Sequence, residues 1–153
     1  MSTSAPARNQ TQARIEEQLL STVDTSASRA LALRAAEAAG DKKASDIRLL
    51  EVGDLLGITD FFLLCSAGND RQLRTVVEEV AYQLKQEQAR VPARREGAPE
   101  TGWMVLDYGD VVVHAFTDEQ RRFYDLERLW ADAPSETFDE LAAVQGERGG
   151  ASG

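Results

Sequence analysis

The chain has 153 residues, 42% of them hydrophobic, and its 26 acidic and 17 basic side chains give a formal net charge of −9. This length suits one domain, and the apolar fraction is too high for a disordered chain. No apolar run approaches the roughly 20 residues that cross a bilayer, and the polar N-terminus is unlike a secretion signal. We therefore expect a cytoplasmic protein, and the acidic charge favours a basic protein partner over a nucleic-acid backbone.

The chain contains a single cysteine, Cys65, and a single histidine, His114. One cysteine cannot form an internal disulfide, which fits a reducing compartment. The pair is also too small a set for a zinc finger or a multi-histidine metal site, so we expect no metal and no other cofactor.

Composition separates a central domain from two tails. The first 25 residues are mostly polar and have few apolar anchors, and the chain ends in a Gly- and Ser-rich stretch typical of flexible linkers. We predict a flexible extension over 1–25, one domain over 26–134 that ends at Pro134, and a flexible tail over 135–153.

The first half of this domain predicts a helix, two strands and a second helix. An Ala-rich helix over Ser26–Ala39 would end at Gly40, followed by a strand over Asp46–Val52. After a glycine-containing loop, the continuous apolar run Phe61–Cys65 indicates a strand that is buried on both faces. Asn69 is then the N-cap of a helix whose apolar side chains recur at helical spacing: Leu73, Val76, Val77, Val80 and Leu84.

The second half predicts a hairpin and a last helix. After a loop over Val91–Pro99 with a short edge strand, strands over Trp103–Tyr108 and Val111–Phe116 would be joined by a two-residue type II′ turn. The expected cross-strand pairs are Trp103 with Phe116, Val105 with His114, and Asp107 with Val112. A final helix capped by Thr117 would place three apolar side chains on one side: Phe123, Leu126 and Trp130. The order of elements predicts an α/β fold with a mixed sheet flanked by helices.

Two features resemble chemical sites, and both have simpler structural interpretations. Asp107, Asp110 and His114 are the only cluster with metal or acid–base character, but the hairpin places Asp107 on a strand face and Asp110 in the turn. The Ser66–Asp70 turn leads into a helix N-terminus, where anions bind, yet it lacks phosphate-loop glycine spacing and is more simply a capped turn. Trp103 and Tyr108 are either core aromatics or, on an exposed hairpin, anchors for a protein partner.

The core resembles the Iojap family, the ribosomal silencing factors. The stretches that carry the resemblance are DKKASDIRLLEV, GITDFFLLCSAGNDRQL, ARREG, GWMVLDYGDVVVHAF and RRFYDLERLWADAP. Together they cover nearly all of 28–134. The tails lie outside the resemblance, and Ser66-Ala67-Gly68 stands where the family more often has a Ser-Gly step.

The resemblance implies a translational repressor that is not an enzyme. Family members bind the large ribosomal subunit through large-subunit ribosomal protein fourteen and block joining of the small subunit when nutrients are scarce. The implied fold is similar to a nucleotidyltransferase-type domain without its catalytic carboxylates. The partner surface maps onto the hairpin, here Trp103, Leu106, Asp107, Tyr108 and Asp110; a homodimer is compatible with the resemblance.

Two alternatives stay open at this point. One is a metal-dependent nucleotidyltransferase-like enzyme, which the lack of a paired-carboxylate strand motif after the Ser66–Asn69 turn disfavours. The other is a binding module with a non-ribosomal target, which rests only on the N-terminal extension.

Overall fold

Six strands form one mixed sheet, in the order β3-β4-β5-β2-β1-β6, in the computed structural model, which describes residues 25–139. β2 and β5 run parallel, and the other neighbouring strands are antiparallel. The predicted α/β class with a mixed sheet is therefore confirmed. The strands span Ser45–Glu51 (β1), Phe61–Ala67 (β2), Arg94–Ala98 (β3), Trp103–Asp107 (β4), Val111–Thr117 (β5) and Ser135–Thr137 (β6).

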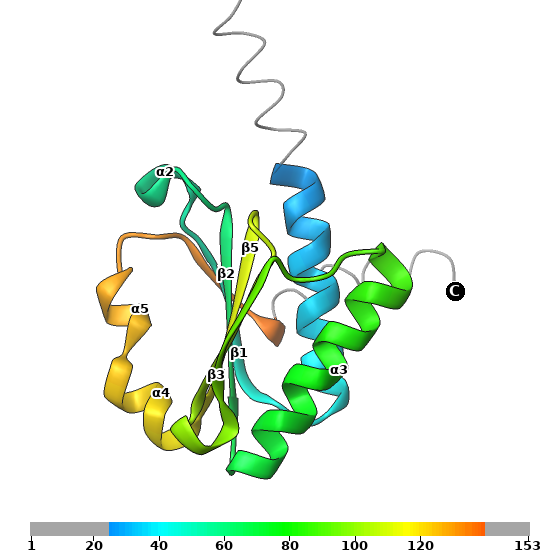
Figure 1. Ribbon diagram of the computed structural model, residues 1–153. Helices are drawn as coiled ribbons and strands as arrows, with labels where there is room; N and C mark the ends of the chain where they lie inside the picture. The colour runs from blue at the N-terminus through cyan, green and yellow to red at the C-terminus, as the bar shows by residue number, and fades with distance from the viewer. Residues whose placement is uncertain (1–24, 140–153) are drawn as a thin grey trace, which may run out of the picture.

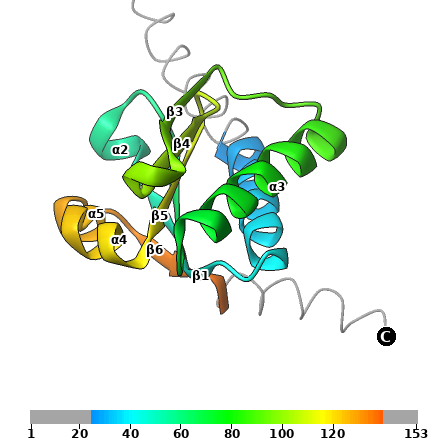
Figure 2. The same ribbon diagram turned by 60° about the horizontal axis from the view of Figure 1, so that its bottom comes forward.

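Helices lie on both faces of the sheet (Figures 1 and 2). One face is covered by a helix at 25–41 and by α3 (Asp70–Gln88); the other carries α2 (Gly53–Leu56), α4 (Asp118–Tyr124) and α5 (Leu126–Leu129). A 3₁₀ turn, Pro99–Thr101, connects β3 to β4. Among the helices of the described residues, none combines the length and the apolar character needed to cross a bilayer.

β2 is the central strand and contributes to two separate cores. All seven of its residues are buried, as the continuous apolar run predicts. Because side chains alternate along a strand, Phe61, Leu63 and Cys65 join the core under α3, whereas Phe62 and Leu64 join the core under α4 and α5.

The predicted α3 helix and the hairpin register are both confirmed. The Asn69 side chain accepts a hydrogen bond from the Gln72 backbone N–H at 2.8 Å, and all five apolar residues predicted for the stripe are buried. Trp103 pairs with Phe116, Val105 with His114 and Asp107 with Val112. The expected short strand before the hairpin is β3, at the edge of the sheet.

The first helix does not end at Gly40. It continues to residue 41, and Lys43 takes the left-handed conformation instead, with φ 67°. A tertiary contact explains why a non-glycine residue is held there, because the Gln72 side chain donates a hydrogen bond to the Lys43 carbonyl at 3.0 Å. The loop that follows β1 also differs from expectation, since it contains the one-turn helix α2, closed by Gly57 at φ 76°.

The last predicted helix is broken in two. α4 ends at Tyr124 and α5 begins after Asp125, whose φ of 46° reverses the backbone. Phe123 consequently points to solvent, with 75% of its surface exposed, while Leu126 and Trp130 pack against the core. The prediction that these three share one side is wrong, because a single left-handed residue changes the helix direction.

The domain also extends beyond Pro134. Residues 135–137 form β6, which pairs with β1, and Phe138 packs against the α3-side core. The predicted boundary is too early because a proline ends a helix but is compatible with the start of an edge strand. The remaining residues of the two predicted tails, 1–24 and 140–153, lie outside the described residues.

The burial of Cys65 gives a first prediction. Its side chain is fully buried in β2, and burial raises the pKa of the thiol to about 12, although the nearby Arg121 acts in the opposite direction. A thiol reagent should therefore label Cys65 slowly in the native protein and rapidly in denaturant, because the thiolate is the reactive form. Equal labelling rates under both conditions would show that this strand is open to solvent.

Candidate functional site

The turn between β4 and β5 is held by backbone and side-chain bonds. The Tyr108 N–H donates to the Val111 carbonyl at 2.9 Å, and Gly109 has φ 90°, which the first central position of a type II′ turn requires. The Asp107 side chain accepts a hydrogen bond from the Gly109 N–H at 2.8 Å. The Asp107 carboxylate therefore stabilises the turn from within.

Asp110 connects this turn to two other segments. Its carbonyl accepts hydrogen bonds from the N–H groups of Asp60 (2.9 Å) and Phe61 (3.2 Å), at the start of β2. Its carboxylate pairs with Arg90 at 2.7 Å and accepts from the Ser28 hydroxyl at 3.1 Å. Burial favours a higher pKa for this carboxyl, but the hydrogen bond and charge of Arg90 outweigh it, so the pKa of Asp110 lies below its ordinary value.

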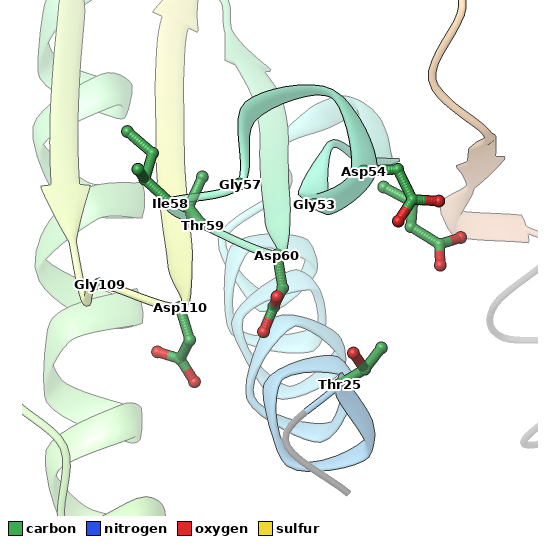
Figure 3. A pocket seen from close by; sticks show the side chains of 10 residues that line it. Thr25, Gly53, Asp54, Gly57, Ile58, Thr59, Asp60, Gly109 and Asp110 are labelled. Carbon is green, nitrogen blue, oxygen red and sulfur yellow. The ribbon is translucent and has the colours of Figure 1, made fainter. Parts of the chain in front are cut away.

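An open cavity of about 500 Å³ lies at this end of the sheet (Figure 3). Asp60 and Asp110 project side by side beyond the ends of β2 and β5, and the Ser28 hydroxyl lies within 2.7 Å of the Asp60 carboxylate. Four carboxylates and no Lys or Arg are found among the described residues that line it; the carboxylates belong to Glu51, Asp54, Asp60 and Asp110. The cavity is therefore acidic.

Trp103 lies at the other end of β4 from the turn. Its ring stacks on Phe116 with centroids 5.1 Å apart, contacts Tyr124 at 4.4 Å, and donates its N–H to His114 Nδ1 at 3.2 Å. Trp103 is only partly buried. It is therefore both a packing residue and a surface residue, as the two sequence interpretations proposed separately.

Leu106 and Tyr108 are both buried, so of the two interpretations of Tyr108 the core aromatic is confirmed and the exposed anchor is wrong. Their exposed fractions are 1% and 6%, and both belong to the core beneath α3. The alternation of side chains along β4 explains this, because it directs Leu106 and Tyr108 to the face covered by α3, opposite to Trp103 and Asp107. Burial raises the pKa of Tyr108 to about 12, while Arg95 and Arg90 act in the opposite direction.

The three residues considered for metal or acid–base chemistry do not converge. Asp107 pairs with Arg94, Asp110 pairs with Arg90, and His114 lies in an aromatic cluster with Phe62 at 4.7 Å. Within residues 25–139, no three His, Cys, Asp or Glu side chains form a group that could hold a metal ion.

His114 predicts a pH-dependent stability. Burial lowers its pKa to about 4, against a smaller opposing effect of Asp107. His114 takes up a proton near pH 6.5 in the unfolded chain but only near pH 4 in the folded chain. Its contribution to the free energy of unfolding is therefore fully present above pH 6.5 and is lost as the pH falls to 4. The loss amounts to about 3 kcal/mol. The free energy of unfolding, measured with urea between pH 7 and 4, should fall more steeply for wild type than for His114→Gln. Parallel pH curves for the two proteins would contradict this role of His114.

The Ser66–Asp70 turn is a capped turn rather than an anion site. The Ser66 hydroxyl accepts a hydrogen bond from Arg121 at 2.8 Å, and the Gly68 N–H donates to the Gln72 side chain at 2.7 Å. The Ser66 hydroxyl and the Gly68 N–H are therefore both already engaged within the protein. The adjacent hollow is lined by one basic residue, Arg71, and by three acidic ones, Asp70, Asp118 and Glu119, so its net negative charge opposes binding of an anion.

A family model described as "Ribosomal silencing factor during starvation" matches residues 25–152, which is most of the chain. The chain belongs to this family. The family resemblance that the hairpin and helix motifs carried is thereby confirmed. The match begins at the helix at 25–41 and continues past Pro134, in agreement with the position of β6 in the sheet.

Relatives of this silencing factor family member occur in bacteria and plants. A ribosomal silencing factor of Bacillus subtilis is 38% identical over 69% of this chain and 88% of its own length. The chloroplastic Iojap protein of Zea mays is 36% identical over 67% of this chain, which corresponds to 44% of that longer relative. A crystal structure of a Chromobacterium violaceum protein, 29% identical, superposes with a TM-score of 0.64 over 67% of this chain and 85% of that one.

Sequence reasoning does not identify three residues at the end of the molecule that carries the β4–β5 turn, which we call the turn end. Nothing in the sequence indicates that Arg90 pairs with Asp110, and Asp60 and Ile58 lie in a stretch that predicts only a loop. A signal was present in Gly57-Ile58-Thr59-Asp60, where an isolated apolar residue follows a glycine and precedes a buried strand. Such an isoleucine belongs to neither a helical nor a strand pattern of apolar residues.

Proposed function

We propose that this protein silences translation by binding the large ribosomal subunit and works without catalytic turnover. The observation that carries the proposal is the family match over 25–152, together with relatives named ribosomal silencing factors. A binding role is supported because Asp107, Asp110 and His114 do not converge on one point, and each is paired with a different side chain: Arg94, Arg90 and Trp103.

The finer proposal is that the hairpin contacts large-subunit ribosomal protein fourteen. Ribosomal proteins are typically basic, and the turn end presents four cavity carboxylates, of which Asp110 alone has an ion pair with a described arginine. Complementary charge of this kind speeds encounter and fixes orientation. Asp110 and Asp107 then contribute charge and turn geometry, and Trp103 contributes a ring at the far end of β4.

Leu106 and Tyr108 act from beneath the surface in this proposal. Both are buried under α3, so they hold β4 and its turn in place and do not touch the partner. A rigid turn loses little conformational freedom on binding, which favours affinity. The bound protein occupies the face that meets the small subunit, and the block is steric.

Co-sedimentation with purified subunits tests the binding. Wild-type protein should pellet with large subunits and not with small ones, and binding should weaken with salt because exposed charge pairs are screened over about 8–10 Å. Asp110→Asn should weaken binding about fivefold, whereas Asp132→Asn, an equal charge change at an exposed position, should not. Equal pelleting with both subunits would contradict the proposal.

A further inference from the structure

The segment 52–60, which contains α2 and which we call the α2 loop, places two large apolar side chains at the same end of the molecule as the hairpin turn. Ile58 is 83% exposed, the largest fraction among the exposed large apolar side chains of residues 25–139, and Leu55 is 50% exposed. Ile58 lines the acidic cavity together with Gly109 and Asp110 (Figure 3). Exposed apolar groups rimmed by charge are typical of protein-binding surfaces.

Hydrogen bonds fix this loop relative to the turn. The Asp60 carbonyl accepts from the N–H groups of Val52 (3.0 Å) and Gly53 (3.2 Å), which closes the loop at its base. The Asp60 N–H then donates to the Asp110 carbonyl at 2.9 Å, which joins the loop to the hairpin. Gly57 closes α2 through its N–H to the Gly53 carbonyl at 2.8 Å. Ile58 is therefore held in position beside the turn before any partner binds.

The charged residues that line the cavity with Ile58 indicate the kind of partner. Asp54 and Asp60 lie on the same loop and Asp110 on the turn, and no Lys or Arg lines the cavity in the described part of the chain. Carboxylates at this density repel phosphate, so they oppose contact with RNA. They complement Lys and Arg side chains, so the partner that fits this surface is a basic protein.

We infer that Leu55 and Ile58 are apolar anchors that seat against a basic protein of the large ribosomal subunit, with the cavity carboxylates pairing around them. This inference rests on the proposed function and extends its contact surface from the hairpin turn to the α2 loop. The loop and the turn then form one continuous surface, joined through the Asp60–Asp110 backbone bond.

The test compares affinities for purified large subunits. Ile58→Ser removes apolar surface without adding charge, and it should weaken binding about tenfold or more if the side chain is buried at the interface. Leu55→Ala should weaken it less. Leu129→Ala, at a residue on α5 that is 70% exposed, is the matched control and should bind like wild type. Thermal melts establish that each variant is folded.

A second variant keeps the test independent of folding effects. Ile58→Cys should give the chain one readily labelled thiol, since the native Cys65 is buried, and bound large subunits should protect that thiol from a reagent. Small subunits should give no protection.

The outcomes separate the inference from the proposed function. Wild-type protein that fails to bind large subunits overturns the proposed function. Wild-type binding with Ile58→Ser within twofold of it, or an unprotected thiol in the bound Ile58→Cys variant, overturns only the inference. A loss confined to Leu129→Ala would move the contact to α5 and also overturn it.

Discussion

Leu106→Ala is expected to lower the free energy of unfolding by about 3 kcal/mol, although the residue lies in the hairpin that we propose as the binding element. Leu106 is 1% exposed, so truncation removes buried apolar surface and leaves a cavity in the core under α3. Urea unfolding monitored by circular dichroism measures the effect. A change within about 0.5 kcal/mol, the range of exposed positions, would show that the side chain faces solvent.

Ile58→Ser is the matched comparison for this prediction. The Ile58 side chain is 83% exposed, so this substitution should leave the free energy of unfolding nearly unchanged while weakening subunit binding. The two variants together distinguish residues that stabilise the turn end from residues that contact the partner. For the same reason Tyr108→Ala is a poor test of binding, because its ring is buried and its loss disturbs the core.

Arg121→Met is expected to cost about 2–3 kcal/mol and to loosen α5 from the sheet. Only 6% of the Arg121 side chain is exposed, and it donates to both oxygens of Glu127 at 3.0 and 3.1 Å and to Ser66 at 2.8 Å. Without Arg121, the Glu127 carboxylate keeps only the more distant Arg48, at 4.0 Å. Losing one partner of a buried pair is destabilising, and the partial exposure of Glu127 limits the loss of stability.

Arg122→Met is the control for the arginine variant. The two residues are adjacent, but Arg122 is exposed and has no ion pair with any of residues 25–139. Its replacement should change the free energy of unfolding by less than about 0.5 kcal/mol. Equal effects of the two substitutions in urea unfolding would contradict the assigned role of Arg121.

The parts of the fold that local patterns determine could be predicted from the sequence. The run Phe61–Cys65 predicts a central strand because every residue is apolar, and the α3 stripe follows from spacing alone. The hairpin register follows from the two-residue turn, since its length fixes which residues face one another. Each of these signals is contained within a short segment.

The parts that failed depend on contacts between distant segments. Asp125 takes a left-handed conformation next to a helix held by Arg121 and Glu127, and neither residue signals this in the sequence. The pairing of β6 with β1 joins residues far apart in the chain. The burial of Tyr108 depends on which face of β4 the α3 helix covers, which the hairpin alone does not specify.

The candidate site was predicted in part. The hairpin was identified by resemblance, and Asp110 does lie at the turn with an ordered set of partners. The α2 loop was missed because its relation to the turn arises from two backbone bonds to the Asp110 carbonyl. Backbone contacts of this kind carry no side-chain signature.

A subunit-joining assay tests directly whether this protein silences translation by a steric block. Purified large subunits are preincubated with increasing amounts of the protein, mixed with small subunits and separated on a sucrose gradient. We expect the subunits to stay apart, the effect to saturate near one copy per large subunit, and no nucleotide to be required. Normal joining of the subunits in the presence of a stoichiometric excess of folded wild-type protein would contradict it.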